Sequence, residues 1–325
     1  MRAAQLGRWA CVLLVLVTLP AIPAAPIPVA AGRGSGRQAT ISVVFSRDAA
    51  PYREALRGFQ EALGSSGVSF VLHALYLDGP LPVARTIDRI REKEPDLILT
   101  IGSNATAVVS DHVRDIPIIF SLVLPSSGTS AFRDDPGRGS NLTGSSMEIP
   151  HSVQFHELKR VFPGARRIGV LFDPEVTGRV VGEAVLAARK AGLELIPMPV
   201  KSESDIAGHR ISEVDVLWSV ADSTVFSSQG LQQVLLSTLR QRVPFVGLSQ
   251  SFVKAGALLA LSVDYSDVGR QSAELASRVL SGERPEDIRM TTPREVILSV
   301  NINTARRIGV EIDDVILRRA EVYGR

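Results

Sequence analysis

The chain contains 325 residues, of which 45% are hydrophobic, 22% charged and 5% aromatic, and its formal net charge at pH 7 is +2. This length and apolar fraction are typical of about two ordinary domains with well-filled cores. Acidic and basic residues are interleaved and aromatic residues are scarce, which argues against a nucleic-acid partner or a membrane-surface role.

The beginning of the chain has the order of a secretory signal. Arg2 and Arg8 precede an apolar run from 9 to 19, and a small, proline-rich stretch from 20 to 31 follows it. The apolar run is shorter than the roughly 20 residues that a transmembrane helix needs. We therefore predict a protein exported through a cleaved signal peptide, with an uncleaved anchor as the alternative.

The signal peptide is expected to cover residues 1–31, with cleavage after Ala25 or Ala31. Residues 32–39 are rich in glycine and arginine and are predicted to form a flexible tether. The only cysteine of the chain, Cys11, lies within the apolar run. Cleavage would therefore leave a mature protein without disulfides, thiolate metal sites or cysteine nucleophiles.

From Thr40 onward, short β-branched runs alternate with amphipathic stretches. This alternation predicts a parallel sheet with helices on both faces. The expected strands of this first unit cover residues 41–45, 68–76, 96–101 and 116–120, and the expected helices cover 51–63, 82–92 and 105–112.

The same alternation restarts after a loop of Ser, Gly, Asp and Pro residues between 121 and 140. The expected strands of the second unit cover residues 167–172, 193–200, 214–218 and 244–247, and the expected helices cover 176–190 and 230–242. The remaining segments, at 257–261, 266–280, 295–300 and 303–308, are too few for a third domain.

We therefore predict an α/β fold of two doubly wound parallel-sheet lobes, joined by a hinge of several crossovers. The first lobe is expected to contain residues 40–145 and about 257–285. The second lobe is expected to contain residues 146–256 and about 286–325.

Ligands of open parallel sheets bind beyond the carboxyl ends of the strands, and two such sheets that face each other form a cleft. The loops at those ends supply the candidate ligand-binding residues of this chain. They are Ser46, Arg47, Ser103, Asn104, Thr106, Ser121, Asp173, Asp222, Ser223, Gln250 and Asp264.

Two of these loops suggest a specific chemistry. The segment 102–106 follows a buried strand and opens a helix, so its N–H groups could hold a carboxylate, although Ser103 or Asn104 could simply cap the helix. Asp222 could pair with an ammonium group or cap the next helix. We expect Asp222→Ala to weaken ligand binding without unfolding the protein. Asp264 could face the cleft or serve the hinge.

A set of short motifs is spread over the chain from Thr40 to the C-terminus. They are Asn141-Leu-Thr-Gly144, Ala165-Arg-Arg-Ile-Gly-Val-Leu171, Ala221-Asp-Ser-Thr224, Gly256-Ala-Leu-Leu-Ala-Leu-Ser-Val-Asp-Tyr265, Gly269-Arg-Gln271 with Leu280-Ser-Gly282, and Val300-Asn-Ile-Asn-Thr-Ala305. In this order and spacing they closely resemble the ABC transporter substrate-binding family that includes tryptophan-uptake binding proteins.

The resemblance implies a type I periplasmic-binding-protein fold with a ligand enclosed between the lobes, and some members of the family bind aromatic amino acids. The chain departs from the family at one place. Many members carry an Asp-Pro pair after the fourth strand, where this chain has Leu124-Pro125. If that acid helps to define the ligand elsewhere, its absence argues against an amino acid here.

Other chemistries receive little support. His151 and His156 are five residues apart, whereas ligands on one helix face are three or four apart, so no metal site is expected. The chain lacks the G-x-S-x-G, G-x-x-x-x-G-K and H-E-x-x-H motifs. Four acids at the expected cleft could do acid–base work, but the sequence pairs none of them with a nucleophile; they are Asp173, Glu175, Asp222 and Asp264. We therefore expect neither an enzyme nor a cofactor.

The sequence as a whole predicts a periplasmic solute-binding protein of an ABC importer. Its expected partners are a small molecule, which could be an amino acid or a related compound, and the permease subunits of the transporter. We expect a monomer. A sensory protein that signals to a membrane receptor is the alternative, because it needs no different cleft. A regulator of the lactose-repressor type would need DNA-binding helices where this chain has a signal.

Overall fold

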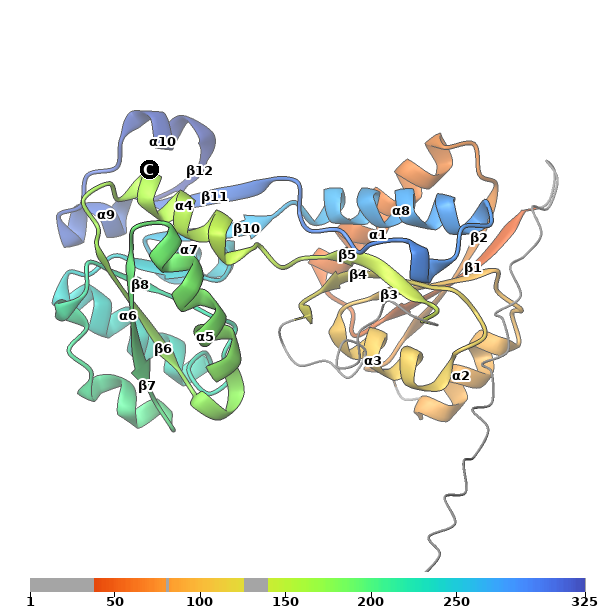
Figure 1. Cartoon of the computed structure of the whole chain (residues 1–325), viewed down its shortest axis with the longest axis horizontal. Coiled ribbons are helices and arrows are strands. Elements are labelled where there is room, and N and C mark those ends of the chain that lie inside the picture. Colours follow the sequence, from red (N-terminus) through yellow and green to blue (C-terminus); the bar gives the residue numbers. More distant parts are fainter. Residues whose placement is uncertain (1–37, 80–81, 126–139, 325) are drawn as a thin grey trace, which may run out of the picture.

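The computed structural model describes residues 38–79, 82–125 and 140–324. The signal peptide, nearly all of the tether and the middle of the loop between 121 and 140 lie outside these residues. The described chain forms two lobes, each built on its own sheet, side by side along the long axis of the molecule (Figure 1).

The first lobe contains a parallel sheet of five strands in the order β2-β1-β3-β4-β5. Every residue of β3 and β4 is buried, which explains why these strands are nearly continuous apolar runs, each with one hydroxyl residue, rather than alternating ones. The strands are β1 (Ala39–Phe45), β2 (Phe70–Tyr76), β3 (Leu97–Ile101), β4 (Ile118–Val123) and β5 (Leu142–Ser146).

Helices cover both faces of this sheet (Figure 1). They are α1 (Ala50–Ser65), α2 (Val83–Arg91), α3 (Ser103–His112) and, from much later in the chain, α8 (Tyr265–Leu280). α1 and α8 lie in direct backbone contact. A Cβ at Gly269 would stand 1.9 Å from the carbonyl oxygen of Ala55, and one at Gly58 would stand 2.0 Å from that of Ser266. Only glycine permits this approach.

The second lobe contains a sheet of seven strands in the order β12-β11-β10-β9-β8-β6-β7. All neighbouring pairs are parallel except β10 and β11, which are antiparallel. The strands are β6 (Arg167–Phe172), β7 (Glu194–Pro199), β8 (Val216–Trp218), β9 (Phe245–Gly247), β10 (Leu259–Val263), β11 (Val296–Asn301) and β12 (Ala320–Tyr323).

The helices of the second lobe again lie on both faces of its sheet (Figure 1). They are α4 (His151–Val161), α5 (Pro174–Lys190), α6 (Ser228–Gln241), α7 (Gln250–Ala255), α9 (Ile302–Ile308) and α10 (Asp314–Arg319). Three short 3₁₀ helices, η3 (Glu203–Gly208), η4 (Ile211–Glu213) and η5 (Pro285–Asp287), complete the described elements.

Three segments of the described chain cross between the lobes. The first runs from β5 to α4, the second from β10 to α8, and the third from η5 to β11 (Figure 1). The fold is thus the predicted one: two α/β lobes of the type I periplasmic-binding-protein kind, joined by several crossovers.

One assignment in this region needs correction. The sequence placed the segment beginning at 257 in the first lobe, but β10 pairs with β9 and β11 in the second sheet, and the chain returns to the first lobe only with α8. The residues from Ala257 to Ala260 are completely buried, and such an apolar run fits the interior of either sheet equally well.

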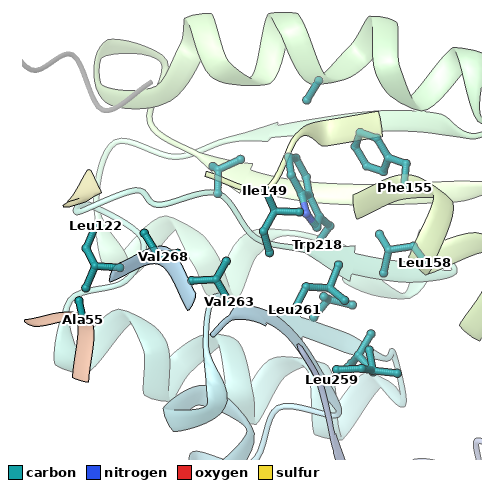
Figure 2. Packing of buried hydrophobic residues seen from close by; sticks show 14 of the residues in the cluster. Ala55, Leu122, Ile149, Phe155, Leu158, Trp218, Leu259, Leu261, Val263 and Val268 are labelled. Carbon is teal, nitrogen blue, oxygen red and sulfur yellow. The ribbon is translucent and has the colours of Figure 1, made fainter. Parts of the chain in front are cut away.

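Apolar packing continues from one lobe to the other at these crossovers (Figure 2). Leu122 and Val268 belong to the first lobe, Trp218 and Leu261 belong to the second, and Ile149 lies in the crossover between them (Figure 2). The pocket described next opens beside this continuous packing.

Candidate functional site

A pocket of about 360 Å³ lies at the carboxyl ends of β8, β9 and β10, against the crossovers. Most of its wall comes from the second lobe, and the first lobe contributes Leu124 and Tyr265. The lining residues are Leu124, Met147, Glu148, Ile149, His151, Gln154, Thr177, Val180, Trp218, Ser219, Val220, Ala221, Val246, Gly247, Leu248, Ser249, Phe252, Leu261, Ser262, Val263 and Tyr265.

Trp218, at the end of β8, is a pocket-lining residue whose side chain is fixed by burial and by a hydrogen bond. Its side chain is only 2% exposed, and its indole N–H donates to Oε1 of Gln154 at 2.8 Å. Nε2 of Gln154 in turn donates to the carbonyl oxygen of Ile149 at 2.7 Å. Because both polar groups of Gln154 are engaged, the indole is held in one orientation and presents an apolar surface to the pocket.

His151 packs edge-on against Trp218, with ring centroids 5.7 Å apart. Burial lowers the pKa of this histidine below its usual 6.5, while the charges of Glu148 and Glu183 oppose that shift. The imidazole is therefore mainly neutral at pH 7. The described residues that line the pocket include one acidic side chain, Glu148, and no lysine or arginine.

Leu124 reaches the pocket because the end of β4 is irregular. Leu122 has a φ of +54°, and the register between β4 and β5 shifts between Ser121 and Val123. A bulge of this kind bends a strand and redirects the side chains that follow. The departure of this chain from the family's Asp-Pro pair thus concerns a residue of the pocket wall, where an apolar side chain now stands.

The start of α3 lies beside Leu124. The backbone N–H of Leu124 donates to Oγ of Ser103 at 3.4 Å. The helix has no cap from its own side chains, so the capping role considered for Ser103 and Asn104 is wrong. Instead, Oγ of Ser46 accepts from the N–H of Ala105 at 2.9 Å.

Gly102 precedes this helix with a φ of +95°, a value that favours glycine. A Cβ at this position would stand 2.6 Å from Oγ of Ser46 and 2.7 Å from the hydroxyl of Tyr52. The hydroxyl groups of Ser46 and Tyr52 therefore lie close to the start of α3. Together with Ser103 they form a polar surface of the first lobe beside Leu124.

The other candidates of the first lobe do not form a group with these. Thr106 is fully buried and bonds within the lobe, to Thr100 at 2.8 Å and to the carbonyl oxygen of Gly102 at 3.0 Å. Ser121 is also buried. Arg47 and Asn104 are exposed.

Asp222 does not line the pocket, contrary to the hypothesis that it meets the ligand. Its side chain is 2% exposed and lies beneath the loop after β8. Oδ2 accepts from the N–H of Asp173 at 2.8 Å and from the hydroxyl of Thr177 at 2.5 Å, and Oδ1 accepts from the N–H groups of Thr224 and Val225 at 2.9 and 3.1 Å. The carboxylate is occupied by these four donors, which join its own loop to the start of α5.

The remaining candidates also serve their own lobe or the hinge. Asp173 caps α5 and accepts from the hydroxyl of Thr224 at 2.9 Å. Gln250 donates to Glu321 at 2.6 Å. Asp264 caps α8 and lies 3.3 Å from Arg270, so it serves the crossover. Ser223 is exposed.

None of the candidate residues lines the described pocket, although four of their loops do. Leu124 comes from the loop of Ser121, Ala221 from that of Asp222, Leu248 and Ser249 from that of Gln250, and Val263 and Tyr265 from that of Asp264. Sequence reasoning favoured polar residues in those loops and missed the apolar wall. Trp218 carried a usable signal, because it is one of two tryptophans in the chain and ends a predicted strand.

Within the described residues, no helix is long and apolar enough to cross a lipid bilayer. The same residues contain no cluster of three or more His, Cys, Asp or Glu side chains that could hold a metal ion.

Two lobes, three crossovers and a pocket between them define a two-lobed small-molecule-binding protein. The model of the ABC transporter substrate binding protein family matches residues 39–323. The chain belongs to this family, and the resemblance seen in its motifs is confirmed.

A tyrosine-binding protein of Clostridioides difficile (strain R20291) is 23% identical over 268 residues, which are 79% of this chain and 77% of that protein.

Two solved structures show the same fold. The ABC domain of Streptococcus pneumonia in complex with L-Trp is 24% identical, with a TM-score of 0.66 over 88% of this chain and 100% of that one. A substrate binding protein with adhesive properties from Clostridium difficile, in its ligand-free, open form, is 20% identical, with a TM-score of 0.74 over 88% of this chain and 99% of that one.

Proposed function

We propose that the protein is the exported solute-binding component of an ABC importer and that its solute is an amino acid or a related compound with a large apolar group. The observation that carries this proposal is the pocket at the crossovers, because its walls come from both lobes. A solute bound there contacts both lobes together only when they are closed, so binding favours the closed form.

The size and surface of the pocket support a solute of this kind. A volume of about 360 Å³ lies within the range of ordinary small-molecule sites. Trp218, Phe252 and Tyr265 supply aromatic surface, and Met147 supplies a flexible apolar one. The relatives named for tyrosine or solved with L-Trp agree with this class of solute.

The experiment that tests solute binding is a calorimetric titration of the exported, purified protein with amino acids, nucleosides, sugars and small organic acids. Leu248→Trp places a large ring in the pocket wall and should abolish binding of the solute found. Leu186→Trp is the matched control, because Leu186 is 61% exposed on α5. Binding that survives Leu248→Trp would contradict this pocket as the site.

Export and the partner need separate measurements. Expression of the full-length gene, followed by fractionation and N-terminal sequencing, should find a periplasmic protein that begins after residue 25 or 31. Chemical cross-linking in intact cells should then join the solute-bound protein to permease subunits. Cross-linking to a membrane receptor instead would favour the sensory alternative.

A further inference from the structure

Most polar side chains of the pocket wall are already hydrogen-bonded within the protein. Trp218 and Gln154 are bonded to each other, and Gln154 is bonded to the backbone as well. The lining hydroxyl groups also have partners; they belong to Thr177, Ser219, Ser249 and Ser262. A solute would have to compete with these bonds for the same groups.

His151, the first residue of α4, differs from these side chains. Within the described chain its ring nitrogens have no hydrogen-bond partner, and neither nitrogen is completely buried. The ring packs against Trp218, another lining residue, with centroids 5.7 Å apart, and against the fully buried Phe155 at 6.5 Å. These contacts fix the imidazole at the pocket wall, with its nitrogens open to a bound molecule.

His151 is also the only basic side chain among the described residues that line the pocket. The charged groups that face it are Glu148 on the crossover and Glu183 on α5, which raise its pKa, whereas burial lowers that pKa by more. A neutral imidazole has one N–H donor and one acceptor nitrogen. The N-terminus of α4, which has no side-chain cap, carries a partial positive charge that favours a solute oxygen over an ammonium group here.

We infer that His151 is a specificity-determining residue of the pocket and donates a hydrogen bond to an acceptor oxygen on the solute, from a carboxylate or from a neutral carbonyl group. This inference rests on the proposed function and refines its solute class to compounds in which such an oxygen adjoins a large apolar body. The apolar body contacts Trp218 and Phe252, and the oxygen lies at the start of α4.

Four probes that share a phenyl ring test this by calorimetry on the exported protein. L-Phenylalanine carries an ammonium and a carboxylate, phenylpropionic acid carries the carboxylate alone, phenylpropionamide carries a neutral carbonyl, and phenethylamine carries the ammonium alone. A parallel series with an indole ring covers a larger body. At least one of the three oxygen-bearing probes should bind, and phenethylamine should bind at least tenfold more weakly.

His151→Phe keeps a ring beside Trp218 and removes both nitrogens. It should weaken binding of the oxygen-bearing probes by about tenfold, the loss of one hydrogen bond to the solute. His156→Phe is the matched control, because His156 is exposed on the same helix and should leave affinity unchanged. His151→Gln keeps a donor and should lose less than His151→Phe. Melting temperatures without ligand would show that each variant is folded.

The pH dependence of binding distinguishes a carboxylate from a neutral carbonyl group. A carboxylate beside His151 favours the imidazolium, so the pKa of the ring rises on binding, and affinity should increase by up to about tenfold per pH unit as the pH falls from 7.5 to 6. A neutral oxygen should give a flatter curve. His151→Gln does not titrate in this range and should abolish the increase, whereas a dependence caused by Glu148 or Glu183 would persist in it.

Equal affinity of wild type and His151→Phe for the oxygen-bearing probes would overturn the inference, as would preferential binding of phenethylamine. If no probe binds but another solute does, with an affinity that His151→Phe leaves intact, the inference fails and the proposed binding function stands. If the folded protein binds no solute of any class, both fail.

Discussion

The loops after β3 and β8 occupy corresponding places in the two lobes. The strand order β2-β1-β3-β4-β5 of the first sheet repeats as β7-β6-β8-β9-β10 in the second. In the first lobe, hydrogen bonding joins the segment after β3 to the loop after the neighbouring strand, β1; in the second lobe, it joins the loop after β8 to the loop after β6. In the first lobe the link is Oγ of Ser46, which accepts from the N–H of Ala105. Asp173 and Asp222 make it in the second lobe.

The first lobe uses the hydroxyl of Ser46 for this link, whereas the second uses the carboxylates of Asp173 and Asp222. The two loops therefore differ in how many of their backbone N–H groups are already hydrogen-bonded. In the second lobe, Asp222 takes up the N–H groups of Thr224 and Val225, so the loop is complete without a ligand and the pocket beside it is left to apolar side chains. In the first lobe, Ser46 takes up one N–H group and brings no charge to the start of α3. The same topology thus leaves an apolar pocket wall after β8 in the second lobe and, in the first lobe, a polar surface at the start of α3 outside the residues that line the pocket.

The largest effect is expected from removing the carboxylate of the second lobe. Asp222→Ala leaves four donors without their buried acceptor, and we expect it to lower the free energy of unfolding by about 3 kcal/mol. Urea unfolding followed by circular dichroism measures this. Asp222→Asn retains one carbonyl oxygen and should lose less. A fully stable Asp222→Ala with weakened ligand binding would restore the original hypothesis of a ligand contact.

A smaller effect is expected at the corresponding link of the first lobe. Ser46→Ala removes the acceptor of the N–H of Ala105, and should cost about 1 kcal/mol of unfolding free energy in the same urea experiment. Ser65→Ala is a suitable control, because Oγ of Ser65 only donates to the preceding turn of α1, at the carbonyl oxygen of Glu61. If Ser46→Ala costs as much as Asp222→Ala, the two links are equivalent and the contrast between the lobes is wrong.

The smallest effect concerns His151 and depends on pH. Because burial lowers its pKa in the folded protein, the unfolded chain takes up a proton first as the pH falls below 6.5, and stability is lost from that pH downward. The loss should stay below about 1 kcal/mol, since the ring is only half-buried. Melting temperatures of wild type and His151→Gln between pH 7.5 and 5 measure it. Parallel curves for the two proteins would show that His151 does not cause the dependence.

Much of the fold could be predicted from the sequence, because its buried strands are β-branched and apolar and its helices are amphipathic. β5 was missed for a physical reason. All of its residues are buried, yet they are Leu142, Thr143, Gly144 and two serines, which give no apolar signal. Gly144 is required there, since a Cβ would stand 2.2 Å from the carbonyl oxygen of Phe120.

Short elements without a distinctive pattern were missed as well. α7 has six residues and β12 has four, too few to show a period. α4 is longer, but only three of its residues, Phe155, Leu158 and Val161, are buried, and polar residues that include two histidines lie between and before them. The placement of β10 depended on pairing between distant segments, which no local pattern records.

The candidate site was predicted at the level of loops and not of side chains. The rule that ligands lie beyond the carboxyl ends of strands led to the edge of the second sheet beside which the pocket lies. It could not show which polar residues turn inward to support the loop, as Asp222 does, and which remain at the surface of the pocket, as His151 does. That distinction depends on the path of the backbone in three dimensions.

The close contact of α1 and α8 through Gly58 and Gly269 has a consequence for the lifetime of a complex. It ties Tyr265, the first residue of α8, to the first lobe, while Val263 ends a strand of the second, and both residues line the pocket. A single residue, Asp264, separates the two walls along the chain. If the protein binds its solute in this pocket as proposed, a rotation that parts the lobes would also part the pocket, and the solute would stay bound only as long as the hinge remains closed.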